Sequence, residues 1–414
     1  MVRLLDVALG RVGRRAGDLD RGAGQDVPGT VVVGVDAAGL RLSEALRAAG
    51  ETGSIRVVSA WADGARDPGA DWLPPSFGPV SNFVQSAVRS VDRGRRLLTL
   101  DDGDELHYDH LVFATGARRP SLPVPGADLP GVFEFREMPS VDWLTRALTV
   151  AHRLVVVGGG AVALEIAAVA RDRDVDVTVV TEHDRLIEPT LSPRTSEYLL
   201  AFHRGRGCRV TVGSAVTRFL ADDLCRVRGL RTESGQIIGG DLVIVAGAEP
   251  RTELAEGCGL EVDGGIVVDG DQATSDPRVF AVGTCCAHRG PGGDVRRLAP
   301  GQDAVVQARA VAHRIREERV SHRVVPSLLS VQGGLRLEIV GWAGAAEPGV
   351  VLGDPDAGSY VQLRFHSGVL VGAESVNRPA DHAAVRRILA SGTTVRRPDV
   401  ADSADLAGLA QRVA

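Results

Sequence analysis

The strongest constraint on the fold of this chain is a pair of glycine-rich turns, each preceded by a run of valines. The second turn, Gly158–Ala163, is an intact G-x-G-x-x-A pattern between an expected strand and an expected helix. In that setting the pattern lets backbone amides approach a dinucleotide pyrophosphate at the helix N-terminus. The first turn, Gly34–Gly39, has the same frame, but Asp36 replaces the middle glycine, where it obstructs and repels phosphate. We therefore expect two dinucleotide-type domains, of which only the second keeps an undamaged site.

The length and charge of the chain limit the classes of protein to which it can belong. Its 414 residues can bury more than one core, and its net charge of −6, with no basic block, gives no support for nucleic-acid binding. No apolar run reaches the ~20 residues that cross a bilayer, and residues 1–28 lack the apolar stretch of a secretory signal. We expect a cytoplasmic globular protein with an N-terminal extension, and no nucleic-acid or membrane partner.

Missing residue types exclude several kinds of chemistry. All 47 residues counted as Lys+Arg are arginine, so the chain has no lysine for Schiff-base or acid–base chemistry. Its five cysteines form no C-x-x-C pair, which argues against a redox disulfide, and the adjacent Cys285 and Cys286 are expected to be reduced thiols. No histidine pair has metal-ligand spacing near another ligand, so we expect no metal.

The order of the expected elements indicates an α/β protein. Strands alternate with helices after each glycine turn, with helices predicted over Ala38–Ala49 and Ala161–Arg171. The last ~90 residues alternate as strands and end in a predicted helix at Ala380–Leu389. The prediction is two Rossmann-like dinucleotide-binding domains, the second inserted in the first, plus a C-terminal α+β domain. The expected ranges are 29–137 with 249–321 for the first domain, 138–248 for the second and 322–414 for the third.

Five motifs in order carry a resemblance to a known family. They are Tyr108–Gly116, Gly158–Glu165, Thr274–Gly283, Gln332–Gly341 and Gly368–Arg378. The string resembles the pyridine nucleotide-disulfide oxidoreductase superfamily, and within it the ferredoxin, putidaredoxin and rubredoxin reductases that serve oxygenases, to which apoptosis-inducing factor is related. The resemblance implies that the first domain holds FAD, the second holds NAD(P)H and the third covers the flavin. It also implies hydride transfer from nicotinamide to flavin and single-electron transfer to a ferredoxin.

Several flavin-contacting positions implied by this resemblance depart from the family pattern. Ser59-Ala60-Trp61 stands where the family has a ribose-binding acid, and Thr284 stands where it has an aspartate. The family lysine that pairs with the counterpart of Glu165 is missing. Four or five such losses amount to about 5–10 kcal/mol if roughly additive, so we predict that FAD binding is lost or weakened. The degenerate flavin-site positions are Gly34, Asp36, Gly39, Thr115, Gly116, Gly283, Thr284, Ser327 and Gln332.

The intact turn predicts a nicotinamide nucleotide site. Specificity between ribose hydroxyls and a 2′-phosphate normally lies about twenty residues further on, at the end of the next strand. An acid near that strand end slightly favours NAD(H), whereas His183 or Arg185 would suit NADP(H). The resemblance also implies a loop near the nicotinamide at Gly247 and Ala248. The expected cofactor-binding residues are Gly158, Gly159, Gly160, Ala161, Val162, Thr181, Glu182, Arg185, Gly247 and Ala248.

Glu165 is the candidate catalytic residue, because it lies on the helix after the intact turn. Without its lysine partner it is either a general base with a raised pKa or a carboxylate paired with an arginine. Asp71, His288 and Gln332 fall on segments that border the flavin cavity in the family, and each is expected to be a surface or hydrogen-bonded residue rather than a catalyst.

These features leave three hypotheses for function. The leading one is an NAD(P)(H)-binding oxidoreductase that has lost or weakened FAD binding and acts on a small organic substrate in the vacated inter-domain cleft. The second is a conventional FAD-dependent NAD(P)H:ferredoxin reductase, in which a shifted loop accommodates Asp36. The third is a non-catalytic protein that binds a nucleotide or a partner, or keeps its glycine turn for packing alone.

Overall fold

The computed structural model describes residues 29–35, 37–60, 83–118, 122–135, 140–297, 304–317, 324–342, 347–401 and 405–413. The chain divides into two compact units, each assembled from segments that are distant in sequence. Unit 1 contains residues up to 117, 250–289 and 295–324, and unit 2 contains residues 118–249, 290–294 and 325–414. Asp36, the segment around Asp71 and the N-terminal extension lie outside the described residues.

Unit 1 is built on a five-stranded parallel sheet in the order β19-β7-β1-β2-β3. The central valines Val31 and Val32 of β1 are fully buried, as expected for a parallel strand covered on both faces. The order places the carboxyl ends of β1 and β7 beside each other, which is where a nucleotide turn belongs in this kind of sheet. The strands are β1 (Gly29–Val33), β2 (Ser54–Ser59), β3 (Phe83–Gln85), β7 (His110–Phe113) and β19 (Val279–Ala281).

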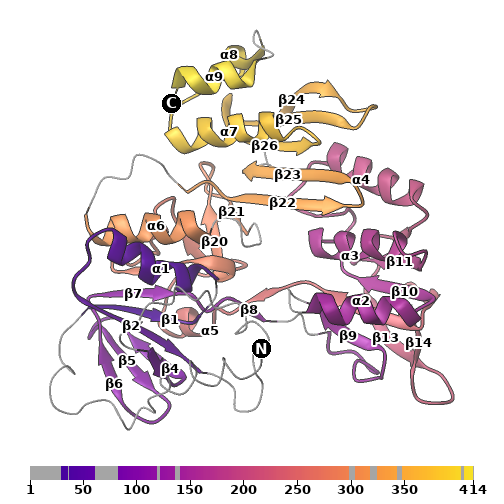
Figure 1. The fold of residues 1–414 in the computed structure, drawn as a ribbon, viewed down its shortest axis with the longest axis horizontal. Helices are drawn as coiled ribbons and strands as arrows, with labels where there is room; N and C mark the ends of the chain where they lie inside the picture. The colour runs from indigo at the N-terminus through magenta and orange to yellow at the C-terminus, as the bar shows by residue number, and fades with distance from the viewer. Residues whose placement is uncertain are drawn as a thin grey trace, which may run out of the picture. The chain divides into compact units, whose positions relative to one another are not determined.

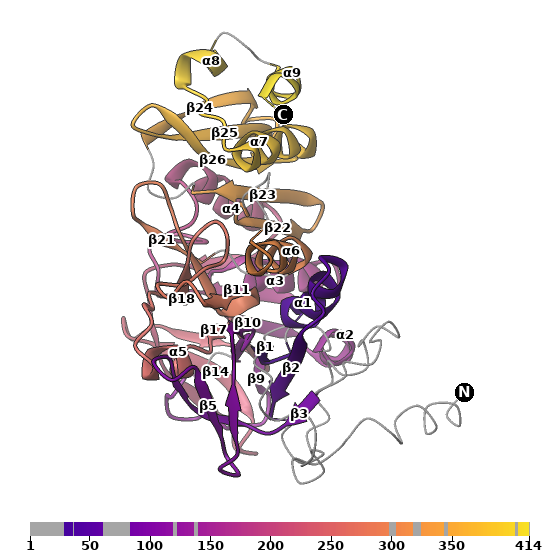
Figure 2. The same cartoon turned by 90° about the vertical axis from the view of Figure 1, so that its left-hand side faces the viewer.

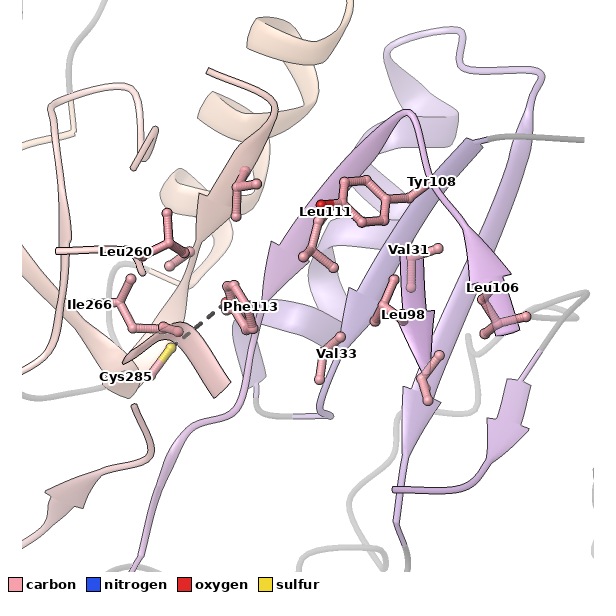
Figure 3. Packing of buried hydrophobic residues seen from close by; sticks show 14 of the residues in the cluster. Val31, Val33, Leu98, Leu106, Tyr108, Leu111, Phe113, Leu260, Ile266 and Cys285 are labelled. Atoms are coloured by element: carbon pink, nitrogen blue, oxygen red, sulfur yellow. Dashed lines mark hydrogen bonds between the residues drawn. The ribbon is translucent and has the colours of Figure 1, made fainter. Parts of the chain in front are cut away.

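Different layers cover the two faces of this sheet (Figure 1). Helices α1 (Ala37–Ala48) and α6 (Ala304–Ile315) pack on one face, where Leu42 and Val311 join the same buried cluster. An antiparallel sheet packs on the other face, and Figure 3 shows its Leu98 among side chains of the parallel sheet. That second sheet consists of β4 (Val88–Asp92), β5 (Leu97–Leu100) and β6 (Glu105–His107).

The remaining elements of unit 1 complete this second layer. The thiol of Cys285 donates to the carbonyl of Phe113 over 3.7 Å, as the dashed line in Figure 3 marks. Cys285 and Cys286 are both free, buried thiols, as predicted. The other elements are α5 (Glu253–Gly257), β18 (Ile266–Val268), a 3-10 turn (Gly283–Cys285), β20 (Cys286–Arg289) and β21 (Val295–Arg296).

Unit 2 contains a second parallel sheet, in the order β12-β11-β10-β16-β9. Its central strand β10 (Arg153–Val157) carries the second valine run, and Val155 and Val156 are fully buried. Helix α3 (Ala161–Arg171) follows β10 directly and buries its alanine-rich face. The other elements are β9 (Val132–Phe135), α2 (Ser140–Val150), β11 (Asp176–Val180), α4 (Pro193–Gly205), β12 (Arg209–Thr211), β13 (Val216–Ala221), β14 (Val227–Thr232), β15 (Ile237–Gly239) and β16 (Leu242–Ala246), with short strands β8 (Ala117–Arg118) and β17 (Glu249–Pro250) at the ends of this segment.

The last part of unit 2 is a five-stranded antiparallel sheet in the order β22-β23-β26-β25-β24. Helix α7 (Pro379–Ser391) lies along this sheet in Figure 2, and Val385 and Ile388 share a buried cluster with Val361. The elements are β22 (Ser327–Gln332), β23 (Leu335–Gly341), β24 (Glu347–Asp354), β25 (Ser359–His366), β26 (Val369–Val376), α7, α8 (Arg397–Ala401) and α9 (Leu406–Val413).

The structure confirms the predicted fold class, with two Rossmann-type sheets and a C-terminal α+β part. Several elements agree closely, including the helices predicted at Ala38–Ala49 and Ala380–Leu389, which are observed at Ala37–Ala48 and Pro379–Ser391. The exact boundaries of the three predicted domains stay a prediction. Among the described residues, no helix is both long and apolar enough to cross a bilayer.

A buried carboxylate, Glu374 of β26, joins the C-terminal sheet to α4 within unit 2. The backbone amide of Ser192 donates to Glu374 Oε1 over 2.8 Å, and the Ser192 hydroxyl donates to Oε2 over 2.6 Å. Ser192 is also the N-cap of α4, where its side chain accepts a hydrogen bond from the amide of Thr195. Burial raises the pKa of Glu374 above its ordinary value, although these hydrogen bonds oppose the shift. Ionisation of this carboxylate therefore lowers the stability of the folded state.

We predict that Glu374→Gln raises the melting temperature of the full-length protein by a few degrees at about pH 8 and by less at about pH 5. A folded-state pKa above the unfolded one means that the stability contributed by protonated Glu374 is complete at acidic pH and is lost as the pH rises through the folded pKa. Glutamine removes that loss and can still accept from Ser192. Thermal unfolding at both pH values checks the prediction.

Glu338→Gln, on the neighbouring strand, is the matched control. It removes the ion pair between Glu338 and Arg336, whose atoms lie 2.7 Å apart, and is expected to lower the melting temperature. Equal destabilisation by both variants at about pH 8 would contradict the account of Glu374.

Candidate functional site

The intact turn of unit 2 is held in shape by its first glycine. Gly158 has φ of +127°, and a Cβ there would lie 2.5 Å from the carbonyl oxygen of Ala246 on β16. Its amide donates to the carbonyl of Val180 over 2.8 Å, which ties the turn to the end of β11. Only glycine fits this position, because both the backbone conformation and the neighbouring strand exclude a side chain.

The next two glycines have different reasons to be glycine. A Cβ on Gly159 would lie 2.8 Å from the Thr181 hydroxyl oxygen, so packing alone demands glycine there. Gly160 is exposed, has φ of −81°, and a Cβ there would meet no atom within 4 Å. Neither backbone strain nor packing requires glycine at this point. The structure therefore leaves open space at Gly160, as a turn that receives a ligand would.

The start of α3 offers donors to that space. Gly160 is the N-cap of the helix and has no side chain, so the amides of Ala161 and Val162 donate to no cap side chain. Ala163 is buried and allows the helix to pack closely on β10. Uncapped amides at a positive helix end suit a pyrophosphate, so these residues fit a dinucleotide.

The end of β11 carries the residues expected to select the ribose. Thr181 is buried beneath Gly159, and its hydroxyl accepts from the amide of His183 over 3.3 Å. Glu182 is exposed at the strand end. Arg185 donates to Glu188 over 2.9 Å, and this hydrogen bond is the largest cause that lowers the pKa of Glu188. Arg185 is therefore already paired with a carboxylate that is not among the predicted site residues.

Gly247 and Ala248 follow β16 at the same edge of the sheet. Strand β16 pairs in parallel with β10, so the carboxyl ends of both strands lie side by side. The amide of Gly247 lies 3.4 Å from the carbonyl of Phe135, its hydrogen-bond acceptor. The predicted nucleotide residues of unit 2 are thus brought to one edge of one sheet.

The first turn, in unit 1, repeats the frame of the second. Gly34 has φ of +103°, its amide donates to Val58 over 2.8 Å, and a Cβ there would lie 2.1 Å from the carbonyl oxygen of Ala114. These three features match those of Gly158 one by one. Gly39 is buried within α1. The described part of this turn therefore fits a second dinucleotide, while Asp36 itself lies outside the described residues.

Other predicted flavin positions of unit 1 bond to the protein itself. The hydroxyl of Thr115 donates to the carbonyl of Arg251 over 2.7 Å, and the carbonyl of Gly116 accepts from the amide of Arg251 over 3.0 Å. The amide of Gly283 donates to Gln307 Oε1 over 2.7 Å, and the carbonyl of Thr284 accepts from Arg297 over 3.3 Å. Thr284 thus stands in an ordered turn without the carboxylate that the family pattern has there.

Glu165 heads a chain of buried polar side chains within unit 2. The Ser330 hydroxyl donates to Glu165 Oε1 over 2.6 Å, and Gln332 Nε2 donates to the Ser330 oxygen over 2.9 Å. Gln332 Oε1 in turn lies 2.8 Å from Nε2 of His203, and burial lowers the pKa of that histidine. Among the described residues the hydrogen-bond partner of Glu165 is Ser330 and no arginine pairs with it, while the alternative role of Glu165 as a general base stays a prediction.

No local sequence pattern predicts these hydrogen bonds, because Ser330 and His203 come from β22 and α4, far from Glu165 in sequence. Ser327, the other predicted position on β22, is also buried. His288, a minor candidate of unit 1, is enclosed, and burial lowers its pKa to about 4. Its neutral ring bonds to the Gln272 side chain over 3.1 Å, which fits the expected structural role. Among the described residues, no cluster of His, Cys, Asp and Glu could hold a metal ion.

Comparison with known proteins agrees with this geometry. A sequence model of the pyridine nucleotide-disulphide oxidoreductase family matches residues 37–309, and a reductase C-terminal model matches residues 330–410. Rhodocoxin reductase of Rhodococcus erythropolis is 35% identical over 399 residues, covering 90% of this chain and 92% of that protein. The chain belongs to the pyridine nucleotide-disulphide oxidoreductase family. Membership makes it an oxidoreductase that uses a pyridine nucleotide, as predicted.

Solved structures extend this likeness through the C-terminal sheet. The ferredoxin reductase for the CYP199A2 system of Rhodopseudomonas palustris has a TM-score of 0.76 and 30% identity, covering 92% of this chain and 99% of its own. Putidaredoxin reductase in its covalent complex with putidaredoxin has a TM-score of 0.77 and 27% identity, covering 93% and 98%. These relatives give no support to the prediction that FAD binding has been lost.

We predict that Gly160→Asp weakens NADH binding about a hundredfold, roughly 2.7 kcal/mol, without lowering stability. A Cβ at Gly160 would meet no atom within 4 Å, and aspartate is a favourable N-cap, so the fold should tolerate the substitution. Its charge would oppose the pyrophosphate, as Asp36 is expected to do in the first turn. Calorimetric titration with NADH and thermal unfolding measure the two effects.

Gly160→Asn is the matched control, because it adds nearly the same volume without the charge. If Gly160→Asn loses less NADH affinity than Gly160→Asp, the difference is due to electrostatic repulsion by the aspartate. NADH affinity unchanged in both variants would contradict the placement of the nucleotide at this turn.

Proposed function

We propose that this chain is an NADH-dependent ferredoxin reductase that uses FAD to deliver electrons to an iron–sulfur protein. The observation that carries the proposal is the extent of the match with reductases of this kind. Rhodocoxin reductase matches over 90% of the chain, and the ferredoxin reductase of Rhodopseudomonas palustris over 92%. The two family models match residues 37–309 and 330–410, which include the intact turn at Gly158–Gly160 and most of the C-terminal sheet.

In this proposal the turn at Gly158–Gly160 binds the pyrophosphate of NADH. The amides at the start of α3 supply donors, and the open space at Gly160 admits the phosphates. Gly247 and Ala248, at the adjacent strand end, lie beside the nicotinamide. The partial positive charge of a helix N-terminus stabilises a bound anion, which would position the nucleotide at the sheet edge.

The residues after β11 support NADH rather than NADPH as the donor. A 2′-phosphate bound after β11 would meet the exposed carboxylate of Glu182, and a second carboxylate, Glu188, belongs to the same loop. Arg185 is the nearby cation, and its guanidinium is already bonded to Glu188 over 2.9 Å. Turning Arg185 toward a phosphate would leave Glu188 without this bond. Ribose hydroxyls can instead donate to Glu182, which suits NADH.

The first turn is proposed to hold the adenosine side of FAD. When bound, FAD accepts a hydride from the nicotinamide and releases electrons singly. The frame around Gly34 supports this assignment, because it matches the frame around Gly158 in dihedral angle, amide bond and close carbonyl contact. Glu165, which accepts from Ser330 and through it contacts Gln332, is proposed to orient groups near the reacting rings rather than to exchange a proton by itself.

A second function keeps NADH but replaces FAD by a small organic substrate. Specific observations in the sequence favour it: Asp36 in the first turn, Thr284 in place of an aspartate, and the complete absence of lysine. In that case NADH would transfer hydride directly to a substrate, or the protein would catalyse a non-redox reaction. The two functions differ in one property that can be measured, which is whether turnover requires flavin.

We expect the full-length protein, supplied with FAD, to catalyse NADH oxidation by ferricyanide and by a purified putidaredoxin-type ferredoxin. Turnover with NADPH should be at least about tenfold slower than with NADH, because two carboxylates would repel the 2′-phosphate of NADPH. Steady-state rates with each donor, with and without FAD, measure both effects. Gly160→Asp is the matched control and should lose NADH-driven turnover.

Absence of acceptor reduction in the presence of FAD and NADH would contradict the proposal. Equal rates with NADH and NADPH would contradict the specificity, while leaving the reductase activity in place.

A further inference from the structure

Unit 1 contains a pocket that neither glycine turn explains. Its volume is about 260 Å³, and its walls carry three arginines, one aspartate and one tyrosine. The arginines come from the β4–β5 turn and from the residue before β19, and the tyrosine comes from the link between β6 and β7. The lining residues are Arg93, Arg96, Tyr108, Asp276 and Arg278.

The pocket lies at the opposite edge of the parallel sheet from the first glycine turn. The backbone of Asp109, next to Tyr108, donates to the carbonyl of Gly29, where β1 begins, and that of Leu111 donates to Arg278. Gly34 follows the other end of β1. At about 3.3 Å per residue, the two ends of this strand are roughly 15 Å apart. A ligand of this pocket is therefore distinct from the dinucleotide of the turn.

One arginine and the aspartate form a fixed wall. Arg93 donates to the carbonyls of Cys258 and Gly259 over 2.7 and 3.1 Å, and to Asp276 Oδ2 over 3.3 Å. The other oxygen of Asp276 accepts from the amide of Arg278 over 3.0 Å. The single negative charge of the pocket is thus engaged on both of its oxygens.

The guanidinium groups of the two remaining arginines are available to bind an anion. Arg96 has a loose ion pair with Asp109, with 3.9 Å between Nη1 and Oδ1, and both side chains are about half exposed. The guanidinium of Arg278 makes no hydrogen bond or ion pair within the described residues. With Arg93 balanced by Asp276, the pocket has an excess of positive charge in a chain whose net charge is −6.

The tyrosine adds a second, independent observation. Tyr108 is 2% exposed, and its hydroxyl is buried with no hydrogen-bond partner within the described residues. Figure 3 shows its ring in the buried cluster with Leu111 and Val31. Burial, followed by the charge of Asp276, raises the pKa of Tyr108 to about 12, so the hydroxyl is a proton donor at neutral pH. A buried donor without an acceptor calls for a bound acceptor.

We propose that this pocket binds a small oxyanion of the phosphate class, held by Arg96 and Arg278 with Tyr108 as a hydroxyl donor. Arginine guanidiniums bind phosphate through paired, charge-assisted hydrogen bonds. The volume is below the range of pockets for drug-sized ligands, which suits inorganic phosphate or the phosphate end of a larger molecule. The site is separate from the proposed reductase chemistry and does not depend on it.

Calorimetric titration of the full-length protein in a low-salt, phosphate-free buffer tests the site, with inorganic phosphate and glycerol 3-phosphate as separate probes. We expect Arg278→Gln to weaken the binding of both probes about tenfold. Arg95→Gln is the matched control, because Arg95 is an exposed arginine of the same turn that does not line the pocket. It should change affinity less than about twofold. Tighter binding of glycerol 3-phosphate would identify a phosphate ester as the ligand class, and tighter binding of phosphate would identify the free ion.

Tyr108→Phe provides a second test whose two effects have opposite signs. It should weaken phosphate binding and, in the phosphate-free protein, raise the melting temperature, since it removes an unpaired buried hydroxyl. Absence of binding by the unaltered protein, or equal weakening by Arg278→Gln and Arg95→Gln, would overturn the proposal. Unchanged phosphate affinity in the Tyr108→Phe variant would contradict the proposed role of the Tyr108 hydroxyl as a donor.

Discussion

The close approach of a carbonyl oxygen to a glycine at the end of a buried parallel strand underlies both halves of this molecule. In unit 1 the carbonyl of Ala114 occupies the place of a side chain on Gly34, and in unit 2 the carbonyl of Ala246 does so on Gly158. This contact turns the chain sharply from strand to helix, so that helix amides lie at the carboxyl edge of the sheet. Sheet order, helix packing and the nucleotide edge all follow from it.

Two further positions show why the two turns can differ in ligand while sharing a frame. Gly159 must be glycine because the Thr181 hydroxyl fills the adjoining space, whereas Gly160 faces open space. A side chain at the third position therefore costs the fold little and bears on the ligand directly. Asp36 occupies that third position in the first turn. The fold can therefore keep both turns, and we expect the charge at this position to influence how tightly each turn would bind a dinucleotide.

Sequence patterns predicted the parts of the structure that depend on local rules. Runs of buried valine and glycine turns located β1, β10 and the helices that follow them, because these patterns act over a few residues. Helix α2 (Ser140–Val150) was missed, and so was β24, which begins at Glu347-Pro348-Gly349. Gly349 stands where a Cβ would lie 1.7 Å from the carbonyl of Leu363, at an irregular register that only the partner strand explains.

In the candidate site, too, local patterns predicted some residues and not others. The residues of the intact turn were recognisable from their spacing, whereas the partners of Glu165 and Arg185 were not. Ser330 reaches Glu165 from a strand 165 positions later, so the contact exists only after the C-terminal sheet has packed on α3. Glu188 lies three residues from Arg185, yet its role depends on how the loop after β11 folds back. Neither contact follows from a local sequence pattern.

The most direct test of the account is the visible absorbance spectrum of the full-length protein after incubation with FAD and desalting, beside Asp36→Gly treated in the same way. The proposed reductase predicts flavin bands at near one FAD per chain for the unaltered protein, and tighter retention for the variant. A colourless unaltered protein that still binds NADH, whether or not Asp36→Gly turns yellow, would contradict FAD-dependent electron transfer and favour direct hydride chemistry on another substrate.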